Sequence, residues 1–270
     1  MKLPPDELEA RPEPRASRRA LRFLGRMSAA AFGVVLIFVC VQTVVREQFA
    51  SSGPSRAAVA APEPYACTGY VALTYDDGPS AGAEELAAAL EQSRLRATFF
   101  MIGKNVEKEP DVVRDLAQRG FAIENHTYSH PDLTGLSRTA LESEIQRGSQ
   151  AIEGVTGQKP ALLRPPEGAT NANVRKVAAG FSATEVIWTT DTDDWQEGKT
   201  AQDIANSALQ VPPGGVILMH DFGSETELDA VPLIAAGLRD RGLCAGKIVP
   251  STTEVPVWDG LSYFATAAPW

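Results

Sequence analysis

Short apolar runs alternate with amphipathic stretches from residue 67 onward. The apolar runs predict strands at 71–74, 97–101, 121–123, 161–163, 185–188 and 216–219, with a weaker one near 247–249. The stretches between them predict helices at about 82–92, 106–118, 137–154, 171–179, 201–209 and 229–240. Strands that alternate with helices are typical of parallel βα units, so the pattern predicts an α/β barrel or an open parallel sheet.

The first 66 residues have a different pattern. Residues 1–26 are polar and rich in Arg and Pro, whereas the 19 residues 27–45 carry no charge. This apolar length approaches the roughly 20 residues that span a bilayer as a helix, and the Arg residues before it predict that the N-terminus is cytoplasmic. We therefore expect a basic tail, one transmembrane or signal-anchor helix, a Pro-containing linker at 46–66, an extracytoplasmic main domain at 67–250 and a C-terminal tail at 251–270.

A cleaved export signal is the alternative for this segment. The sequence at 17–21, Ser-Arg-Arg-Ala-Leu, loosely resembles a twin-arginine motif, and Ala-Val-Ala at 58–60 is an A-x-A cleavage site. That site is more than ten residues beyond the apolar stretch, which favours the anchor. Both interpretations export the main domain, so we expect a single-pass membrane protein or, alternatively, a secreted one.

Charge and cysteine content narrow the possible partners and the compartment. Residues 61–270 hold 16 basic and 29 acidic side chains, and this acidic balance argues against nucleic acid as a partner. Nothing in the sequence indicates an obligate protein partner. Outside the apolar segment the cysteines are Cys67 and Cys244, which can form a disulfide in an exported domain. Two unpaired thiols are equally compatible with the sequence.

Polar clusters follow five of the predicted strands. They are Asp76-Asp77-Gly78-Pro79, the segment 125–131, Arg164-Pro165-Pro166, the segment 191–195 and His220-Asp221. Because the carboxyl ends of parallel strands form the active face of α/β proteins, these clusters should converge in space.

His126 and His130 form an H-x-x-x-H pair, and on a helical turn such a pair faces one way. Two imidazoles and one carboxylate make a three-ligand metal site with an open position; zinc is its usual metal, and Co2+, Ni2+ or Mn2+ are tolerated. Asp76 and Asp77 can supply the carboxylate, and neighbours on an extended backbone point in opposite directions, so that one binds metal while the other has another task. A simple Asp-Asp-Gly-Pro turn is the alternative.

The ordered motifs resemble those of the polysaccharide deacetylases, carbohydrate esterase family 4. They are Thr74-Tyr75-Asp76-Asp77-Gly78-Pro79, His126-Thr127-x-x-His130-Pro131, Arg164-Pro165-Pro166-x-Gly168, Asp191-x-x-Asp194-Trp195 and Leu218-Met219-His220. The resemblance implies a distorted (β/α)7-type barrel. It also implies a divalent metal and hydrolysis of N-acetyl groups on a polysaccharide such as peptidoglycan or chitin, with release of acetate.

The resemblance also implies a role for each matching residue. Asp77, His126 and His130 would hold the metal, Asp76 would be the catalytic base and His220 the general acid. Arg164 would orient Asp76, and Asp194 would hold Arg164 or His220. The residues expected to contact substrate are Trp195 and Leu218, around the acetyl methyl group, and the turn at Pro166 and Glu167.

One departure from the family pattern bears on the substrate. Glu167 stands where the family usually has Tyr, and a carboxylate there could favour a partly deacetylated, cationic polymer. Two other functions use the same motifs: an O-acetyl esterase acting on a glycan such as acetylated xylan, and a catalytically weak glycan-binding protein.

Overall fold

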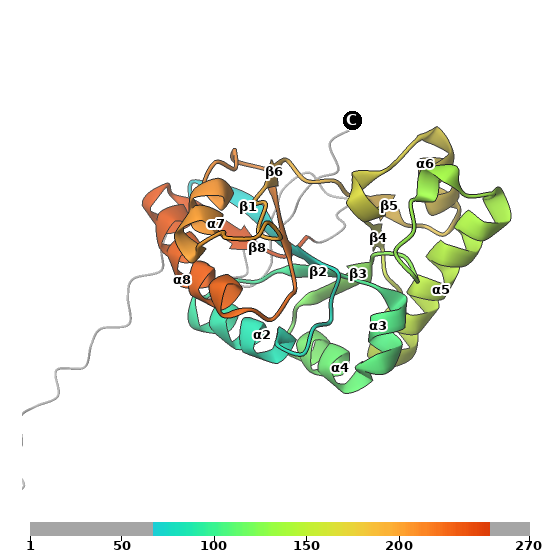
Figure 1. Cartoon of the computed structure of the whole chain (residues 1–270), viewed down its shortest axis with the longest axis horizontal. Helices are drawn as coiled ribbons and strands as arrows, with labels where there is room; N and C mark the ends of the chain where they lie inside the picture. Colours follow the sequence, from blue (N-terminus) through green and yellow to red (C-terminus); the bar gives the residue numbers. More distant parts are fainter. Residues whose placement is uncertain (1–66, 249–270) are drawn as a thin grey trace, which may run out of the picture. The chain divides into compact units, whose positions relative to one another are not determined.

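The computed structural model describes residues 67–248, in which eight parallel-paired strands form one curled sheet (Figure 1). The sheet order is β5-β4-β3-β2-β1-β7-β6, and β8 pairs with β1. The strands are β1 (Gly69–Asp76), β2 (Thr98–Met101), β3 (Ala122–Asn125), β4 (Leu162–Leu163), β5 (Thr184–Glu185), β6 (Thr190–Asp191), β7 (Val216–His220) and β8 (Leu243–Gly246).

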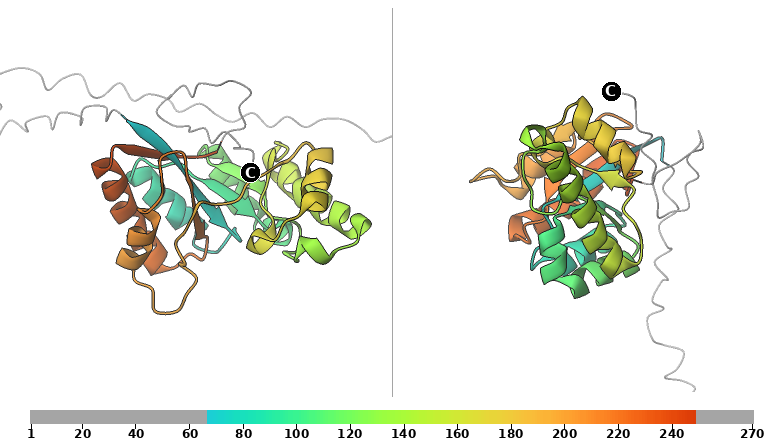
Figure 2. Two further views of the ribbon diagram at one scale, coloured as in Figure 1. Left: turned by 90° about the horizontal axis from the view of Figure 1, so that it is seen from above. Right: turned by 90° about the vertical axis from the view of Figure 1, so that its right-hand side faces the viewer.

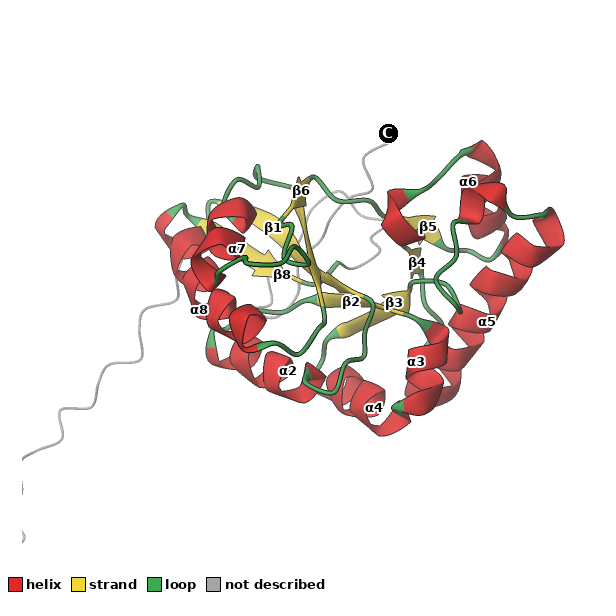
Figure 3. Cartoon of the chain, viewed as in Figure 1, coloured by secondary structure: helices red, strands yellow, loops and turns green. Residues whose placement is uncertain are grey.

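The helices lie in an arc along the outer side of the sheet (Figure 3). They are α2 (Ala83–Gln92), α3 (Gly103–Lys108), α4 (Pro110–Gln118), α5 (Arg138–Thr156), α6 (Ala172–Gly180), α7 (Ala201–Ala208) and α8 (Glu225–Asp240), with 3-10 turns at η1 (Leu133–Gly135) and η2 (Pro166–Gly168). The pair α7 and α8 and the pair α5 and α6 lie at opposite ends of this domain in Figure 1 and in the left view of Figure 2.

Alternation along the strands separates two apolar layers. Tyr75 and Phe99 belong to the large core between the sheet and the helices, where their rings stack with centroids 5.4 Å apart. Phe100, the next residue of β2, belongs instead to a smaller cluster with Leu162 and Ile248. Successive side chains of a strand point to opposite faces, so this smaller cluster fills the inner side of the curled sheet.

The predicted parallel α/β architecture is confirmed, and the sheet is a curled half-barrel consistent with the (β/α)7 expectation. Among the strand pairings of the described chain, β5 and β6 at the two edges each have one neighbour, so the sheet remains open between them.

Several predicted elements differ from those observed. The predicted helix at 106–118 is two helices, because Pro110 lacks an N–H, fits the first turn of α4 and interrupts the hydrogen-bond ladder. The strand expected near 247–249 is displaced: β8 lies four residues earlier, residues 247 and 248 belong to no strand, and residue 249 lies outside the described residues. The strand expected at 185–188 is shortened to β5, and β6 is an additional short strand after it.

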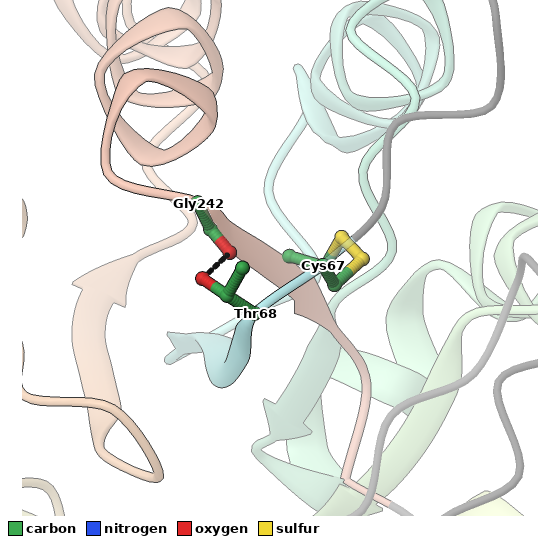
Figure 4. The surroundings of a disulfide bond; sticks show 4 residues. Cys67, Thr68 and Gly242 are labelled. Atoms are coloured by element: carbon green, nitrogen blue, oxygen red, sulfur yellow. Dashed lines mark hydrogen bonds between the residues drawn. A yellow bond between two sulfur atoms is a disulfide. The ribbon is translucent and has the colours of Figure 1, made fainter.

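A disulfide between Cys67 and Cys244 joins the start of β1 to β8, as one of the two sequence interpretations predicted (Figure 4). The Cα atoms are 5.6 Å apart and the cysteines are 177 positions apart in sequence. Next to the bond, Thr68 donates to the carbonyl of Gly242 from both its N–H, at 2.8 Å, and its hydroxyl, at 3.0 Å. The first strand is therefore tied to the last at its amino end.

The predicted single-pass membrane location is contradicted. No helix within residues 67–248 is long and apolar enough to cross a membrane. The tail at 1–26, the predicted transmembrane helix at 27–45, the linker at 46–66 and the C-terminal tail at 251–270 lie outside the described residues. The membrane location is not retained.

Candidate metal centre

Asp77, His126 and His130 come together after β1 and β3, and one ligand atom from each lies within 4.8 Å of the others. The Asp77 Oδ1 atom is 3.4 Å from His126 Nε2 and 3.3 Å from His130 Nε2. Burial opposes ionisation of Asp77, but the neighbouring imidazoles of His126 and His130 outweigh it and lower its pKa. The carboxylate is therefore ionised, as a metal ligand must be.

Two observations test whether this cluster fits a metal. Asp77 Oδ1 is a buried oxygen without a hydrogen-bond partner, a rare state that a cation relieves. His126 Nδ1 lies 2.8 Å from the carbonyl oxygen of Arg164, which can only accept, so Nδ1 carries the proton and Nε2 presents its lone pair to Asp77. Two imidazoles and a carboxylate in this state fit a divalent metal such as zinc.

The loop that carries the two histidines is not helical, so the reason expected for their convergence is wrong. Instead, Thr127 and His130 adopt left-handed backbone angles, with φ of 68° and 62°. Asn125 Oδ1 accepts from the N–H of Thr127 at 2.8 Å, and the Thr127 hydroxyl accepts from the N–H of His130 at 3.0 Å. These local bonds bend the chain so that both rings face Asp77.

Helix α5 supports this loop through Glu144 and Gly148, two residues that were not predicted from the sequence. Glu144 accepts hydrogen bonds from the N–H groups of Tyr128 and Ser129, at 3.2 and 2.8 Å, and from the Ser129 hydroxyl at 2.9 Å. One turn later, a Cβ on Gly148 would lie 2.3 Å from Asn125 Oδ1. In the sequence, Glu144 looks like an ordinary solvated helix residue. The signal for a close contact is Gly148, which lies four residues later, one helical turn away.

The loop of Asp77 is held from two sides. Asn105 donates from Nδ2 to the Asp77 carbonyl at 2.9 Å. On the other side, Asp221 accepts from the N–H of Ser80 at 3.1 Å and from its hydroxyl at 2.6 Å. Asp221 is 3% exposed and lies so close that Gly78 has no room for a side chain. Asp221 therefore braces the loop of Asp77, and does so from the position after His220.

Asp76 is paired with a buried arginine. Arg164 Nη1 donates to Asp76 Oδ1 at 2.7 Å and to the Thr74 hydroxyl at 2.8 Å, and its guanidinium lies 4.1 Å above the ring of Phe100. The other oxygen, Asp76 Oδ2, faces the metal cluster at 3.7 Å from His126 Nε2. Arg164 is completely buried and fixed on several sides, so it holds the orientation of the Asp76 carboxylate.

His220, at the end of β7, is held by Asp194. Its Nδ1 donates to Asp194 Oδ1 at 2.8 Å, and its backbone N–H donates to Oδ2 at 2.7 Å. Burial lowers the pKa of His220, but the hydrogen bond and charge of Asp194, with the charges of Asp76 and Asp77, raise it overall. The sequence left Arg164 or His220 as the partner of Asp194, and in the structure the partner is His220.

The residues expected to contact substrate lie on both sides of this centre. Leu218 on β7 is 3% exposed, whereas Trp195, after β6, is 58% exposed. Pro166 is buried, and Glu167 is exposed in the η2 turn after β4, with φ of 55°. The Glu167 charge is close enough to oppose the lowering of the His130 pKa that burial and His126 cause. Glu167 therefore lies near enough to the cluster for its charge to act on His130.

Comparison with known proteins gives consistent matches. A family model described as "Polysaccharide deacetylase" matches residues 65–186. A solved family 4 carbohydrate esterase from Streptomyces lividans, in complex with acetate, is 44% identical with a TM-score of 0.66, and the match covers 69% of this chain and 96% of that one.

Two full-length relatives differ in the substrates that their names state. A bifunctional xylanase/xylan deacetylase of Cellvibrio japonicus is 37% identical over 69% of this chain and 28% of its own length. A peptidoglycan-N-acetylglucosamine deacetylase of Bacillus cereus is 36% identical over 64% of each. The chain thus spans less than two thirds of these two relatives.

Proposed function

Because the chain belongs to the polysaccharide deacetylase family, we propose that it is a metal-dependent hydrolase that removes N-acetyl groups from a cell-envelope polysaccharide of N-acetylglucosamine and releases acetate. The observation that carries the proposal is the cluster of Asp77, His126 and His130 between two separately held groups, Asp76 and His220. Amide hydrolysis needs such a base and acid as distinct groups with opposite tuning.

Asp77, His126 and His130 would hold the metal, for which zinc is our first choice and Co2+, Ni2+ or Mn2+ are alternatives. When bound there, the metal would polarise the acetyl carbonyl and make water a stronger nucleophile. His130 is 30% exposed in its side chain, so the centre is open on that side to an incoming acetyl group.

Asp76 would take the proton from the attacking water through Oδ2, the oxygen that Arg164 does not occupy. Arg164 is a positioning residue, because it contacts Asp76 and not the reacting atoms. Its buried charge also stabilises the ionised carboxylate before the reaction begins.

His220 would give a proton to the leaving nitrogen from Nε2, since its Nδ1 proton is engaged by Asp194. An amine leaves poorly unless its nitrogen is protonated, so this step needs an imidazolium. The raised pKa of His220 supports that assignment. Leu218 and Trp195 would contact the acetyl methyl group, and the turn at Pro166 and Glu167 would contact the sugar.

The direct test is acetate release by the full chain, loaded with zinc, from peptidoglycan, chitopentaose and acetylated xylan. We expect release from the first two, and loss of release in Asp76→Asn with zinc content unchanged. If no N-acetylated glycan yields acetate with Zn2+, Co2+, Ni2+ or Mn2+, the proposal is wrong.

An O-acetyl esterase is the second candidate, and the xylan deacetylase among the relatives favours it. An alkoxide leaves more easily than an amine, so an esterase depends less on a general acid. His220→Ala should therefore reduce acetate release from chitopentaose far more than release from acetylated xylan. Wild-type activity on acetylated xylan alone would favour the esterase.

A further inference from the structure

Large exposed hydrophobic side chains are scarce in residues 67–248, where they are Trp195, Phe222 and Leu233. Two of the three belong to the loops that carry the proposed acid and its partner: Trp195 follows Asp194, and Phe222 is two residues after His220. Leu233 lies on the outer helix α8. Exposed apolar groups gathered at a polar site mark a ligand-binding surface more often than scattered ones do.

The Phe222 ring lies parallel to the imidazole of His220. Their centroids are 5.2 Å apart and their planes differ by 8°. With 47% of the residue exposed, the ring is accessible to a ligand beside the imidazole. It therefore extends the proposed reaction centre next to the proton donor.

The backbone under this ring is firmly held. Glu227, which is 4% exposed, accepts through Oε2 from the N–H groups of Phe222 at 3.2 Å and Gly223 at 2.9 Å. Gly223 has φ of 65° and packs so tightly against Gly82 that neither has room for a Cβ. A ring on such a loop is ordered before any ligand arrives, which lowers the entropic cost of binding.

The sheet order places this ring on one side of the metal cluster. Along β4-β3-β2-β1-β7-β6, Glu167 follows β4, the metal cluster follows β3 and β1, and Phe222 and Trp195 follow β7 and β6. Phe222 and Trp195 thus lie on the β7 side of the metal cluster, and Glu167 lies on the β4 side.

We propose that Phe222 forms a sugar-binding subsite, stacking on the pyranose ring adjacent to the N-acetylglucosamine unit whose acetyl group is removed. A β-linked N-acetylglucosamine ring carries its substituents equatorially, so its two faces present C–H groups that pack well on an aromatic face. The inference rests on the proposed function, because it assumes a glycan at the metal centre. It adds that the substrate is recognised as a chain of sugars and not as a single residue.

The test uses the zinc-loaded full chain and chitopentaose. Phe222→Ala should raise KM for chitopentaose about tenfold while kcat changes by less than about threefold, since an aromatic contact contributes roughly that much to binding. Phe222→Trp should restore the wild-type KM. Leu233→Ala, which removes an exposed side chain of similar size away from the site, is the matched control and should have the wild-type KM.

A small ester separates a subsite from an effect on His220. The loss caused by Phe222→Ala should be about tenfold greater for chitopentaose than for 4-nitrophenyl acetate. An equal loss for both substrates, carried by kcat or by a shifted pH profile, would show that the ring acts on the imidazole and would overturn the subsite.

Calorimetry keeps this inference distinct from the proposed function. Asp76→Asn protein with and without Phe222→Ala is titrated with chitopentaose, and the double variant should bind about tenfold more weakly. Aromatic-dependent binding without acetate release by the wild type would leave the subsite standing while the proposed activity fails. If the wild type releases acetate but Phe222→Ala changes neither KM nor binding, the proposed activity stands and the subsite is wrong.

Discussion

Asp76 and Asp77 are neighbours in the chain, and their different contacts suit them to the different tasks that we propose. Asp76 ends β1 and is paired with the buried guanidinium of Arg164. Asp77 has φ of 69°, which turns its carboxylate toward His126 and His130. Such left-handed angles cost about 1–3 kcal/mol outside glycine, and they persist only where surrounding contacts impose them.

Replacing each carboxylate in turn should separate the two tasks. Asp77→Ala removes one of three ligands and should weaken zinc binding by at least about 100-fold. Asp76→Asn should retain zinc but lose acetate release. Zinc content after dialysis and competition with a chromogenic chelator measure both. Equal loss of zinc in the two variants would show that Asp76 is itself a ligand.

We expect Asp194 to set the pH range in which His220 acts as the proposed acid. Its hydrogen bond and charge raise the pKa of His220 against the opposing effect of burial, so the imidazole stays protonated to higher pH. In Asp194→Asn the raising effect is weakened and burial remains, so the pKa falls. The alkaline limb of the kcat/KM profile should move to lower pH, with kcat/KM reduced about 10- to 100-fold. If the alkaline limb does not move in Asp194→Asn, that limb does not report the protonation of His220.

Glu167 is the departure from the family pattern that we expect to affect the substrate. Its charge acts on His130, so it would also attract the ammonium group of a deacetylated glucosamine at the centre. Wild-type protein should prefer partly deacetylated chito-oligomers over fully acetylated ones, and Glu167→Tyr should reduce that preference by a few-fold. The ratio of kcat/KM for the two oligomers at low and high salt measures it. An unchanged ratio would contradict the role of the carboxylate.

At the scale of elements, helix α5 supports the candidate metal centre, although it carries none of the proposed ligands. It supports the histidine loop through Glu144 and through the close approach of Gly148 to Asn125. The histidine loop and α5, whose contacting residues are 15 or more positions apart in sequence, thus determine one another's conformation.

A pair of glycine substitutions on α5 tests this support. Gly148→Ala places a methyl group against Asn125 and the backbone of Thr127, and should destabilise the fold by about 1–3 kcal/mol and weaken zinc binding. Gly154→Ala lies on the same helix with nothing within 4 Å, and should instead stabilise by up to about 1 kcal/mol. Denaturant midpoints and zinc affinity measure both. A Gly148→Ala variant that behaves like the control would exclude the contact.

The sequence predicts this centre better than it predicts the elements around it. The order of strands and the gathering of an Asp pair with His126 and His130 follow from apolar runs and the polar residues after them, because parallel strand ends converge. The choice of Asp77 as the ligand comes from the family resemblance. The conformation of the histidine loop does not follow, since it depends on the distant Glu144 and Gly148. The ends of the short strands β5 and β6 escape prediction for a similar reason: two-residue strands leave no periodic pattern.

At the scale of the whole domain, one covalent link outside the backbone, a disulfide, is expected to contribute to the free energy of unfolding. The Cys67–Cys244 disulfide connects β1, which carries Asp76 and Asp77 at its other end, to the last strand. A crosslink over such a long separation chiefly restricts the unfolded chain.

Removing the link should lower the free energy of unfolding by about 2–4 kcal/mol. The Cys67→Ser/Cys244→Ser double variant and the wild type in reductant should show the same loss by denaturant titration, whereas reductant should not affect the variant. The double variant and the reduced wild type should both still bind zinc at low denaturant. A wild type whose midpoint is unaffected by reductant would show that the bond does not contribute.

The same disulfide makes the domain a closed covalent ring, since the peptide chain from Cys67 to Cys244 returns to its own beginning. A single proteolytic cut at any exposed loop within the ring opens it without releasing a fragment. The nicked protein would keep every strand and both halves of the metal centre on one molecule, and would separate into two pieces only after reduction. In an environment rich in proteases, the domain would therefore tolerate a first cleavage.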